Sequence, residues 1–229
     1  MTGPVALLGS GEFLPVMERL DRRLLEGRPQ RVVHLPTAAG QESGRRLRYW
    51  RDLARTHFER MGVEVETLGV LDANSANDPA NVSRLSGAGL IYLSGGNPGY
   101  LAVALRGSAV LERISRLMDE GVAVAGCSAG AAALTEVAPD VRSGGSDAAG
   151  LRLIPGVAIV PHYDALTRRR RALGEMFTRS ASPDTTVIGV DENTAIFTDD
   201  RTTFEVYGVG RAVRLSDGTV FGPGDRFEV

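Results

Sequence analysis

The sequence predicts an α/β protein whose mostly parallel sheet is covered by helices on both faces. Two observations support this fold class: short apolar runs alternate with amphipathic stretches, and most of the apolar runs have no polar alternation. The chain has 229 residues, of which 43% are hydrophobic. This size and composition suit one globular domain, so a single domain over 1–229 is expected.

The predicted elements follow from periodicity and turn residues. Strands are expected at 5–9, 31–36, 63–68, 89–95, 122–127, 157–161 and 186–191. Helices are expected at 15–27, 45–62, 98–119 and 166–178. In the second of these helices, Leu47, Trp50, Ala54, Phe58 and Met61 recur at spacings of three to four residues and form one apolar face.

The C-terminal part, 192–229, has a different pattern. Its short alternating runs are separated by turn dipeptides, Asp-Asp at 199–200 and Asp-Gly at 217–218. We interpret it as an antiparallel β-extension of the same domain.

Composition excludes several kinds of chemistry. All 26 basic residues are arginine, so a Walker phosphate loop, a pyridoxal Schiff base and a Ser–Lys dyad, each of which needs a lysine, are ruled out. The three histidines and the single Cys127 are far apart in sequence, and neither an HExxH nor a CxxC motif occurs, so no metal or cofactor is expected. Cys127 is expected to be a small buried residue.

Charge and hydropathy patterning bear on partners and location. The net charge of −2 gives no support for binding nucleic acid or an anionic membrane. No run of 18 apolar residues is present, and the N-terminal residues lack the pattern of a secretory signal. We therefore expect a cytoplasmic protein with neither a nucleic-acid nor a membrane partner.

Residues 126–130, Gly-Cys-Ser-Ala-Gly, join a buried-strand pattern to a good helix former. This G-x-S-x-G context is typical of a nucleophile elbow, in which the serine sits on a tight strand-to-helix turn. Ser128 is therefore the candidate nucleophile, and the N–H of Ala129 is a candidate oxyanion donor. A second donor is expected in the glycine-rich segment 94–101, which follows another strand.

His162 is the candidate general base. It follows the strand at 157–161, and the carboxyl ends of parallel strands meet at one edge of the sheet, so it should reach the same edge as the elbow. His34 lies within a strand pattern and His57 lies beside the apolar face of a helix, so both are expected to be structural.

Several carboxylates are candidates for the acid that orients the base. Glu136, Asp140 and Asp147 lie between the serine and the histidine in sequence, but Glu136 is expected on the post-elbow helix and aimed away. Glu192 follows the strand at 186–191 and also approaches the edge. The residues alone leave the choice open.

The segments SGGNPGYL, GCSAGAAAL, GLRLIPGVAIVPHYD and IGVDENTAIF occur in an order that resembles the peptidase E and cyanophycinase family of serine peptidases. The resemblance runs from about Val5 to the β-rich tail. It implies a flavodoxin-like fold related to class I glutamine amidotransferases, with a serine elbow in place of the amidotransferase cysteine.

The resemblance also implies roles for individual residues. It implies Ser128 as nucleophile, His162 as general base, and Gly96 and Ala129 as oxyanion donors. For the acid it favours Asp140, narrowly, over the alternative Asp147. Counted back from His162, Asp140 falls where the dipeptidase branch of the family keeps its Asp, whereas Asp147 resembles the acid of the cyanophycinase branch, and the loop is shorter here than in either branch.

Substrate contacts are implied at four positions, which are Asn97, Arg168, Arg171 and Glu192. Arginines suit a carboxylate-bearing substrate because their guanidinium groups pair with it bidentately. Glu192, in the Asp-Glu-Asn-Thr-Ala segment, is expected either to bind a substrate amino group or to brace its loop.

The resulting hypothesis is a serine peptidase that hydrolyses short Asp-containing peptides, either Asp-Xaa dipeptides or β-Asp-Arg units, through an acyl-enzyme. Its partner would be a small acidic peptide, and the resemblance implies a homodimer. Two alternatives are a non-catalytic relative that binds a small ligand, and an amidase or amidotransferase-like hydrolase.

Overall fold

The computed structural model describes residues 2–142, 149–165 and 175–229, and its strands form two sheets. The strands are β1 (Val5–Leu8), β2 (Arg31–Leu35), β3 (Glu64–Thr67), β4 (Leu90–Leu93), β5 (Ala123–Cys127), β6 (Val157–Val160), β7 (Thr186–Val190), β8 (Thr194–Thr198), β9 (Thr203–Gly208), β10 (Ala212–Arg214), β11 (Val220–Phe221) and β12 (Arg226–Glu228). Each predicted strand up to residue 191 is present within one or two residues of its expected bounds, which confirms those predictions.

The larger sheet has eight strands in the order β12-β9-β8-β1-β5-β4-β2-β3. From β1 to β3 in this order, every neighbouring pair is parallel. Leu8 pairs with Cys127, and Leu93 pairs with Gly126, so the carboxyl ends of three central strands lie level at one edge. Functional sites of parallel sheets occupy this edge.

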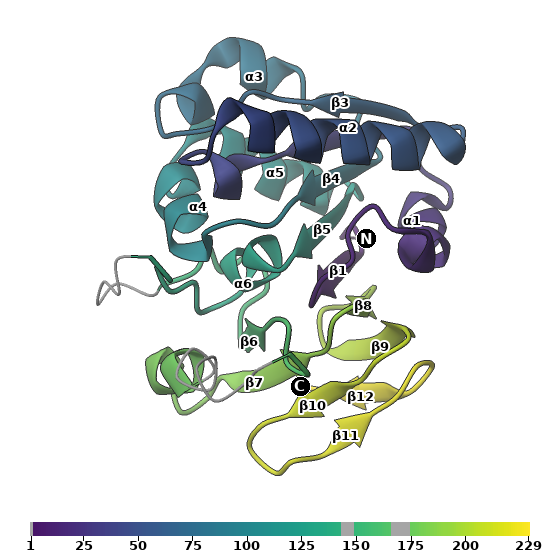
Figure 1. The fold of residues 1–229 in the computed structure, drawn as a ribbon, viewed down its shortest axis with the longest axis vertical. Helices are drawn as coiled ribbons and strands as arrows, with labels where there is room; N and C mark the ends of the chain where they lie inside the picture. Colours follow the sequence, from purple (N-terminus) through teal and green to yellow (C-terminus); the bar gives the residue numbers. More distant parts are fainter. Residues whose placement is uncertain (1, 143–148, 166–174) are drawn as a thin grey trace.

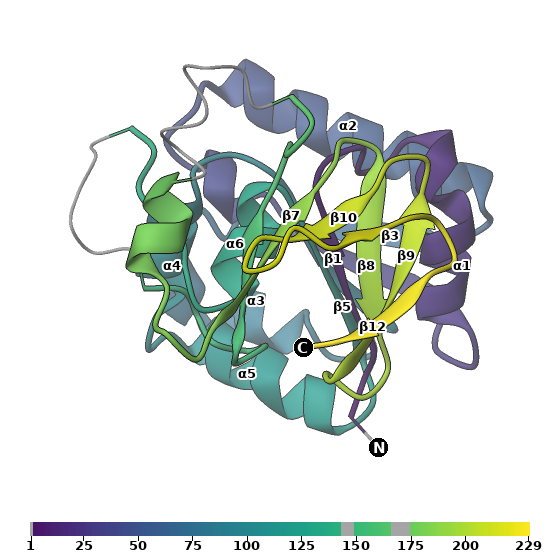
Figure 2. The ribbon, with the colours of Figure 1, turned by 90° about the horizontal axis from the view of Figure 1, so that it is seen from below.

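Helices cover the parallel part of this sheet on both faces (Figure 1). They are α1 (Glu18–Leu25), α2 (Gly44–Arg60), α3 (Pro79–Ser83), α4 (Pro98–Leu105), α5 (Ala109–Asp119) and α6 (Ala129–Leu134), with single 3₁₀ turns at Pro15–Met17, Thr37–Ala39 and Ser75–Asn77. In Figure 2, α1 and α2 lie on one side of the strands, and α4, α5 and α6 lie on the other.

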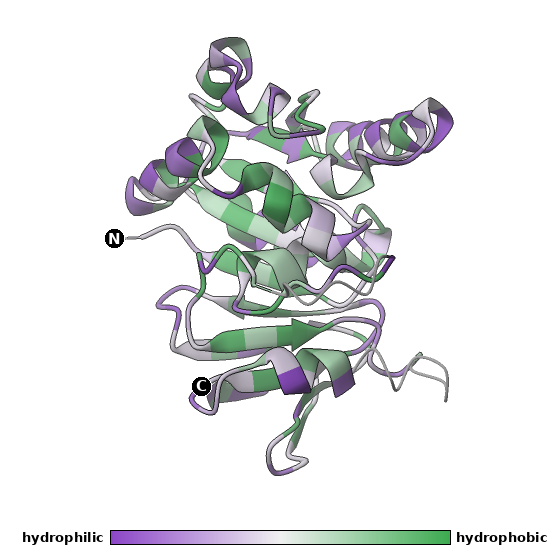
Figure 3. Ribbon diagram, turned by 90° about the vertical axis from the view of Figure 1, so that its left-hand side faces the viewer, coloured by the Kyte–Doolittle hydropathy of each residue, from purple (hydrophilic) through white to green (hydrophobic). Residues whose placement is uncertain are grey.

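Two buried clusters, one for each face, make up the core. On β1, Val5 and Leu7 join the cluster of α4, α5 and α6, whereas Ala6 and Leu8 join that of α1 and α2. Successive side chains of a strand point to opposite faces, so a strand covered on both sides must be apolar throughout. Figure 3 shows these hydrophobic strands inside, with hydrophilic residues concentrated on the helices. The predicted fold class is thereby confirmed.

The second sheet differs from the prediction, which placed the strands at 157–161 and 186–191 in the same sheet as the others. Instead, β6 and β7 pair in parallel with each other and continue antiparallel to β10 and β11. The reason is that β8 pairs antiparallel with the free side of β1, so that edge of the parallel sheet is already occupied. The C-terminal extension thus contributes strands to both sheets.

The predicted helix at 98–119 is two helices. Gly107 has a φ of 68°, and the Ser108 side chain accepts a hydrogen bond from the Leu111 N–H (3.2 Å) and caps the second helix. Of the predicted helix at 166–178, residues 166–174 lie outside the described part, and 175–180 are helical. Across the described ranges, no helix has the length and apolarity needed to cross a bilayer.

Candidate active site

Ser128 occupies the turn between β5 and α6, with a φ of 51° and a ψ of −107°. A non-glycine residue rarely adopts this conformation, which is found at nucleophile elbows. The glycines on either side allow the tight packing of the turn. A Cβ added to Gly126 would lie 2.6 Å from the backbone of Gly130, and one added to Gly130 would lie 2.1 Å from the carbonyl oxygen of Leu93. The elbow geometry predicted from G-x-S-x-G is therefore present.

His162 lies beside this serine. It stands two residues after β6, and its Nε2 is 2.9 Å from the Ser128 Oγ. The distance is that of a hydrogen bond, so a proton can pass from the hydroxyl to the ring without further movement. The predicted pairing of serine and histidine at one edge is therefore present.

The other ring nitrogen of His162 faces Glu192. Its Nδ1 lies 2.8 Å from the Glu192 Oε1. Because β6 and β7 are parallel neighbours, the residues that follow them emerge side by side. The two loops are also joined, since the Glu192 N–H donates to the Asp164 Oδ1 (2.9 Å). Among the described residues, both nitrogens of the imidazole are thus partnered, one by the hydroxyl and one by this carboxylate.

This arrangement corrects the expectation that Asp140 orients the base. The Asp140 Oδ1 accepts hydrogen bonds from the Asn97 Nδ2 (2.8 Å) and the Arg142 N–H (2.9 Å). The loop that carries Asp140 packs against the start of α4, where its backbone touches Gly99, and the position beside the histidine Nδ1 belongs to Glu192. The alternative acid, Asp147, lies outside the described residues.

The residues predicted to contact substrate do not all lie at the cavity or within the described part of the chain. Asn97, which directly precedes α4, is only 1% exposed. Its side-chain amide donates a hydrogen bond to Asp140. Its side chain therefore braces this loop instead of facing an open surface, contrary to the expectation. Arg168 and Arg171 lie outside the described residues. Glu192 does lie at the site, but against the histidine.

A cavity of about 370 Å³ opens beside the nucleophile. The described residues that line it are Gly96, Pro98, Ser128, Ala129, Val141, Val160, Pro161, His162, Phe177 and Glu192. Both predicted oxyanion donors therefore border the cavity that contains the serine. As the first residue of α6, Ala129 has an N–H with no acceptor inside the helix.

Gly96 belongs to a segment whose neighbouring N–H groups are occupied. The Gly95 N–H donates to the Glu12 carboxyl (3.1 Å), and the Asn97 N–H donates to the Ala38 carbonyl (2.8 Å). With a φ of 149°, and with the Ala38 carbonyl oxygen 2.3 Å from where a Cβ would stand, position 96 accepts only glycine. The arrangement thus leaves the Gly96 N–H as the donor available from this segment.

Comparison with known proteins identifies the family of the chain. Residues 5–206 match the model of peptidase family S51. The chain belongs to peptidase family S51. The resemblance expected from the sequence is thereby confirmed.

Relatives of this S51 chain include cyanophycinases from Synechococcus elongatus and Thermosynechococcus vestitus. Each is 30% identical over an alignment of 206 residues, and the alignment covers 85% of this chain and 59% of the relative's length. A crystal structure of a peptidase from an acI-B1 actinobacterium superimposes with a TM-score of 0.90 at 30% identity, covering 100% of this chain and 98% of the other.

A crystal structure from Listeria monocytogenes EGD-e, provisionally described as a peptidase E protein, is also similar. It has a TM-score of 0.66 at 19% identity and covers 94% of this chain and 100% of its own. At this identity the similarity concerns the fold.

The other histidines of the S51 chain are buried and structural, as predicted. His34 donates or accepts at both nitrogens, toward Thr67 Oγ1 (3.0 Å) and Ser94 Oγ (2.9 Å), and burial lowers its pKa to about 3. His57 pairs with the buried Asp21 at 2.7 Å. In the part of the chain that the structure describes, no cluster of three metal-binding side chains occurs.

One acidic residue at the site was not recognised from sequence, and another was recognised only as one of several candidates. Glu192 was among the candidate acids because it follows the strand at 186–191, but the resemblance favoured Asp140 and gave Glu192 a substrate-binding or bracing role. Glu12 was not singled out at all. The only signal was an acidic residue in the glycine-rich segment after β1, at the same edge of the sheet as the elbow.

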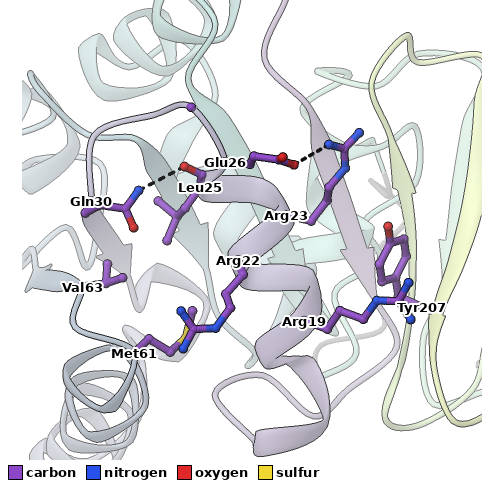
Figure 4. A pocket seen from close by; sticks show the side chains of 10 residues that line it. Arg19, Arg22, Arg23, Leu25, Glu26, Gln30, Met61, Val63 and Tyr207 are labelled. Atoms are coloured by element: carbon purple, nitrogen blue, oxygen red, sulfur yellow. Dashed lines mark hydrogen bonds and ion pairs between the residues drawn. The ribbon is translucent and has the colours of Figure 1, made fainter.

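A larger cavity, of about 510 Å³, lies along α1 and away from the catalytic edge (Figure 4). Arg19, Arg22 and Arg23 line it, but Arg22 pairs with Glu18, and Arg23 pairs with Glu26 and Asp199. Because these carboxylates neutralise two of the three arginines, the cavity has no strong character of an anion site.

Proposed function

We propose that the protein is a serine peptidase that hydrolyses short Asp-containing peptides, with Ser128 as nucleophile, His162 as general base and Glu192 as the acid that orients the base. The observation that carries the proposal is the continuous chain of hydrogen bonds from the serine hydroxyl through the imidazole to the carboxylate, 2.9 Å and 2.8 Å long, beside a cavity.

In this mechanism the imidazole takes the hydroxyl proton while the Ser128 Oγ attacks the carbonyl carbon of the scissile bond. The N–H groups of Gly96 and Ala129 stabilise the oxygen that becomes negative. Glu192 keeps the Nδ1 protonated and stabilises the imidazolium. His162 then gives its proton to the leaving amine. In the second half of the reaction His162 takes a proton from water, the water oxygen attacks the acyl carbon, and the proton returns to the Ser128 Oγ as the acid product leaves.

The substrate class rests on different support. The similar proteins from Synechococcus elongatus and Thermosynechococcus vestitus are named cyanophycinases. The substrate contacts expected at Arg168 and Arg171 suit a substrate carboxylate. The chain spans 59% of the length of these relatives, so the activity proposed is that of the part they share. The cytoplasmic location and the homodimer expected from the sequence stay predictions.

A fluorophosphonate probe and a peptide panel test the proposal together. The probe should label Ser128 stoichiometrically, and Asp-Leu and β-Asp-Arg should be cleaved, whereas Ser128→Ala should lose both properties. A wild-type protein that resists the probe and binds peptides without cleaving them would instead be a ligand-binding relative. Hydrolysis of glutamine in preference to Asp-Leu would indicate an amidase.

A further inference from the structure

A second carboxyl group, that of Glu12, lies buried behind the nucleophile. Glu12 belongs to the loop that leaves the carboxyl end of β1, and it is only 6% exposed. It is not among the described residues that line the cavity of Ser128 and His162. Burying a carboxyl group is unfavourable unless hydrogen bonds replace its water, so its partners indicate what it does.

Those partners belong to the two segments that form the expected oxyanion hole. The Glu12 Oε1 accepts from the Gly95 N–H (3.1 Å), and the Oε2 accepts from the Cys127 thiol (2.8 Å). Burial raises the pKa of the Cys127 thiol, which therefore stays protonated and remains a donor. One carboxyl group thus connects the residue before Gly96 to the residue before Ser128.

The spacing around Gly95 shows how tight this connection is. A Cβ at this position would lie 3.1 Å from the Glu12 Oε1, 3.6 Å from the Ser128 Cβ and 3.9 Å from the Ser128 Oγ. A side chain at position 95 would therefore be crowded between the carboxyl group and the nucleophile, and glycine allows both to approach this segment closely.

The same loop also contacts the segment that carries Glu192. The Ser10 hydroxyl accepts from the Asn193 N–H (3.2 Å), one residue beyond the proposed acid. The loop after β1 is thereby in contact with three of the segments at the catalytic edge.

We propose that Glu12 is a positioning residue, which holds the Gly95–Gly96 segment against the elbow so that the Gly96 N–H faces the developing oxyanion. The assignment rests on the proposed peptidase function. Its physical basis is that the carboxyl occupies the Gly95 N–H and fixes that peptide plane, which sets the orientation of the peptide that follows. An oxyanion donor contributes only when it is aligned before the reaction.

Three substitutions of Glu12 distinguish the effect of its hydrogen bonds from the effect of its side-chain volume. Glu12→Gln retains an oxygen for the Gly95 N–H and fills the same volume. Glu12→Ala removes the acceptor, and Glu12→Asp keeps the carboxyl but shortens its reach by one methylene. Glu26→Ala, which removes an exposed carboxylate just after the end of α1, is the matched control.

The rates are expressed per fluorophosphonate-reactive site, so that poorly folded protein does not count. Since deleting an oxyanion donor costs about 10²- to 10³-fold in kcat, we expect a misaligned one to cost about 10- to 100-fold in Glu12→Ala, with KM nearly unchanged. Glu12→Asp should be intermediate, and Glu12→Gln should stay within about threefold of wild type. The control should be unaffected.

A second readout does not depend on turnover. A peptide boronate forms a tetrahedral adduct with the serine, and its affinity should fall in Glu12→Ala by the same factor as kcat/KM. A role confined to stability would lower the melting temperature and leave both the rate per site and the boronate affinity as in wild type, which would overturn the assignment.

Equal losses of rate per site in Glu12→Gln and Glu12→Ala would also overturn the assignment of Glu12, because the hydrogen-bond acceptor retained in Glu12→Gln would then make no contribution to catalysis. The wild-type protein distinguishes this failure from that of the proposed function. If it neither reacts with the probe nor cleaves peptides, both proposals fall. If the wild-type protein reacts with the probe and cleaves peptides, and Glu12→Ala has the same rate per site, only the assignment of Glu12 falls.

Discussion

Replacing Glu192 with glutamine tests which carboxylate serves His162. The side chains are nearly isosteric, so the change removes the negative charge beside the Nδ1 and little else. An amide can still accept from the ring, but it stabilises the imidazolium far less than a carboxylate does. The corresponding change in a buried serine-protease triad lowers kcat by about 10⁴-fold.

The expected loss is smaller here because water reaches this pair. The side chains of His162 and Glu192 are 32% and 41% exposed, so solvent compensates for part of the lost charge. We therefore expect kcat/KM to fall about 10²- to 10³-fold, which corresponds to about 2.7 to 4 kcal/mol of transition-state stabilisation. KM should change little, since the carboxylate acts on the base.

Asp140→Asn is the matched comparison, because it too exchanges a carboxylate for its isosteric amide. Its oxygen can still accept from Asn97 and from the Arg142 N–H, so kcat/KM should change by less than about threefold. Both variants are assayed by steady-state hydrolysis of a short peptide, with active sites titrated by the probe. A large loss in Asp140→Asn together with an unaffected Glu192→Gln would refute the reasoning.

Three further predictions concern stability. Burial lowers the pKa of His34 to about 3. Between about pH 6.5 and 3, His34 is therefore protonated in the unfolded state and neutral in the folded state. As the pH drops through this window, the free energy of unfolding should fall by up to about 1.4 kcal/mol per pH unit. Denaturant titrations at several pH values should show a shallower slope in His34→Gln. A Cβ at Gly130 would lie 2.1 Å from a carbonyl oxygen of β4. Gly130→Ala should therefore destabilise the protein by about 2 kcal/mol or more, although alanine gains about 1 kcal/mol in helix propensity. The control is Gly44→Ala, where a Cβ would meet no atom closer than 3.5 Å, and this change should not lower the melting temperature. His57→Leu should cost about 3 to 5 kcal/mol in chemical denaturation by leaving Asp21 buried without its partner, and the double change to leucine should cost less than the single one; equal or additive losses would contradict this.

The elbow was predictable because its determinants are local. A buried strand, the sequence G-x-S-x-G and a helix former are contiguous, and the close approaches of Gly126 and Gly130 involve the turn itself and the adjacent strand. The parallel strands were predictable for the same reason, since a strand covered on both faces must be apolar along its length. His162 followed from its position after such a strand.

The carboxylate that orients His162 could not be identified from local sequence. Its identity depends on which strand lies beside β6, and that neighbour, β7, begins 26 residues after β6 ends and pairs with it in a separate sheet. Alternation of strands and helices does not indicate that β8 will occupy the edge of β1 and divert β6 and β7 elsewhere. Glu12 was missed for a related reason, because its partners Gly95 and Cys127 are 83 and 115 residues away.

The proposed catalytic groups come from both sheets, so their distance depends on how the sheets meet. Ser128 extends from the large sheet, and the small sheet carries His162 and Glu192 as a pair. Between them, Ala132 on α6 shares a buried cluster with residues of β6 that include Ala158 and Val160. A small side chain on the helix permits close packing there, and the left-handed backbone at both the serine (φ 51°) and the histidine (φ 54°) turns the two side chains toward each other. The 2.9 Å hydrogen bond is therefore a consequence of packing between the sheets, as well as of the elbow sequence from which the serine alone could be recognised.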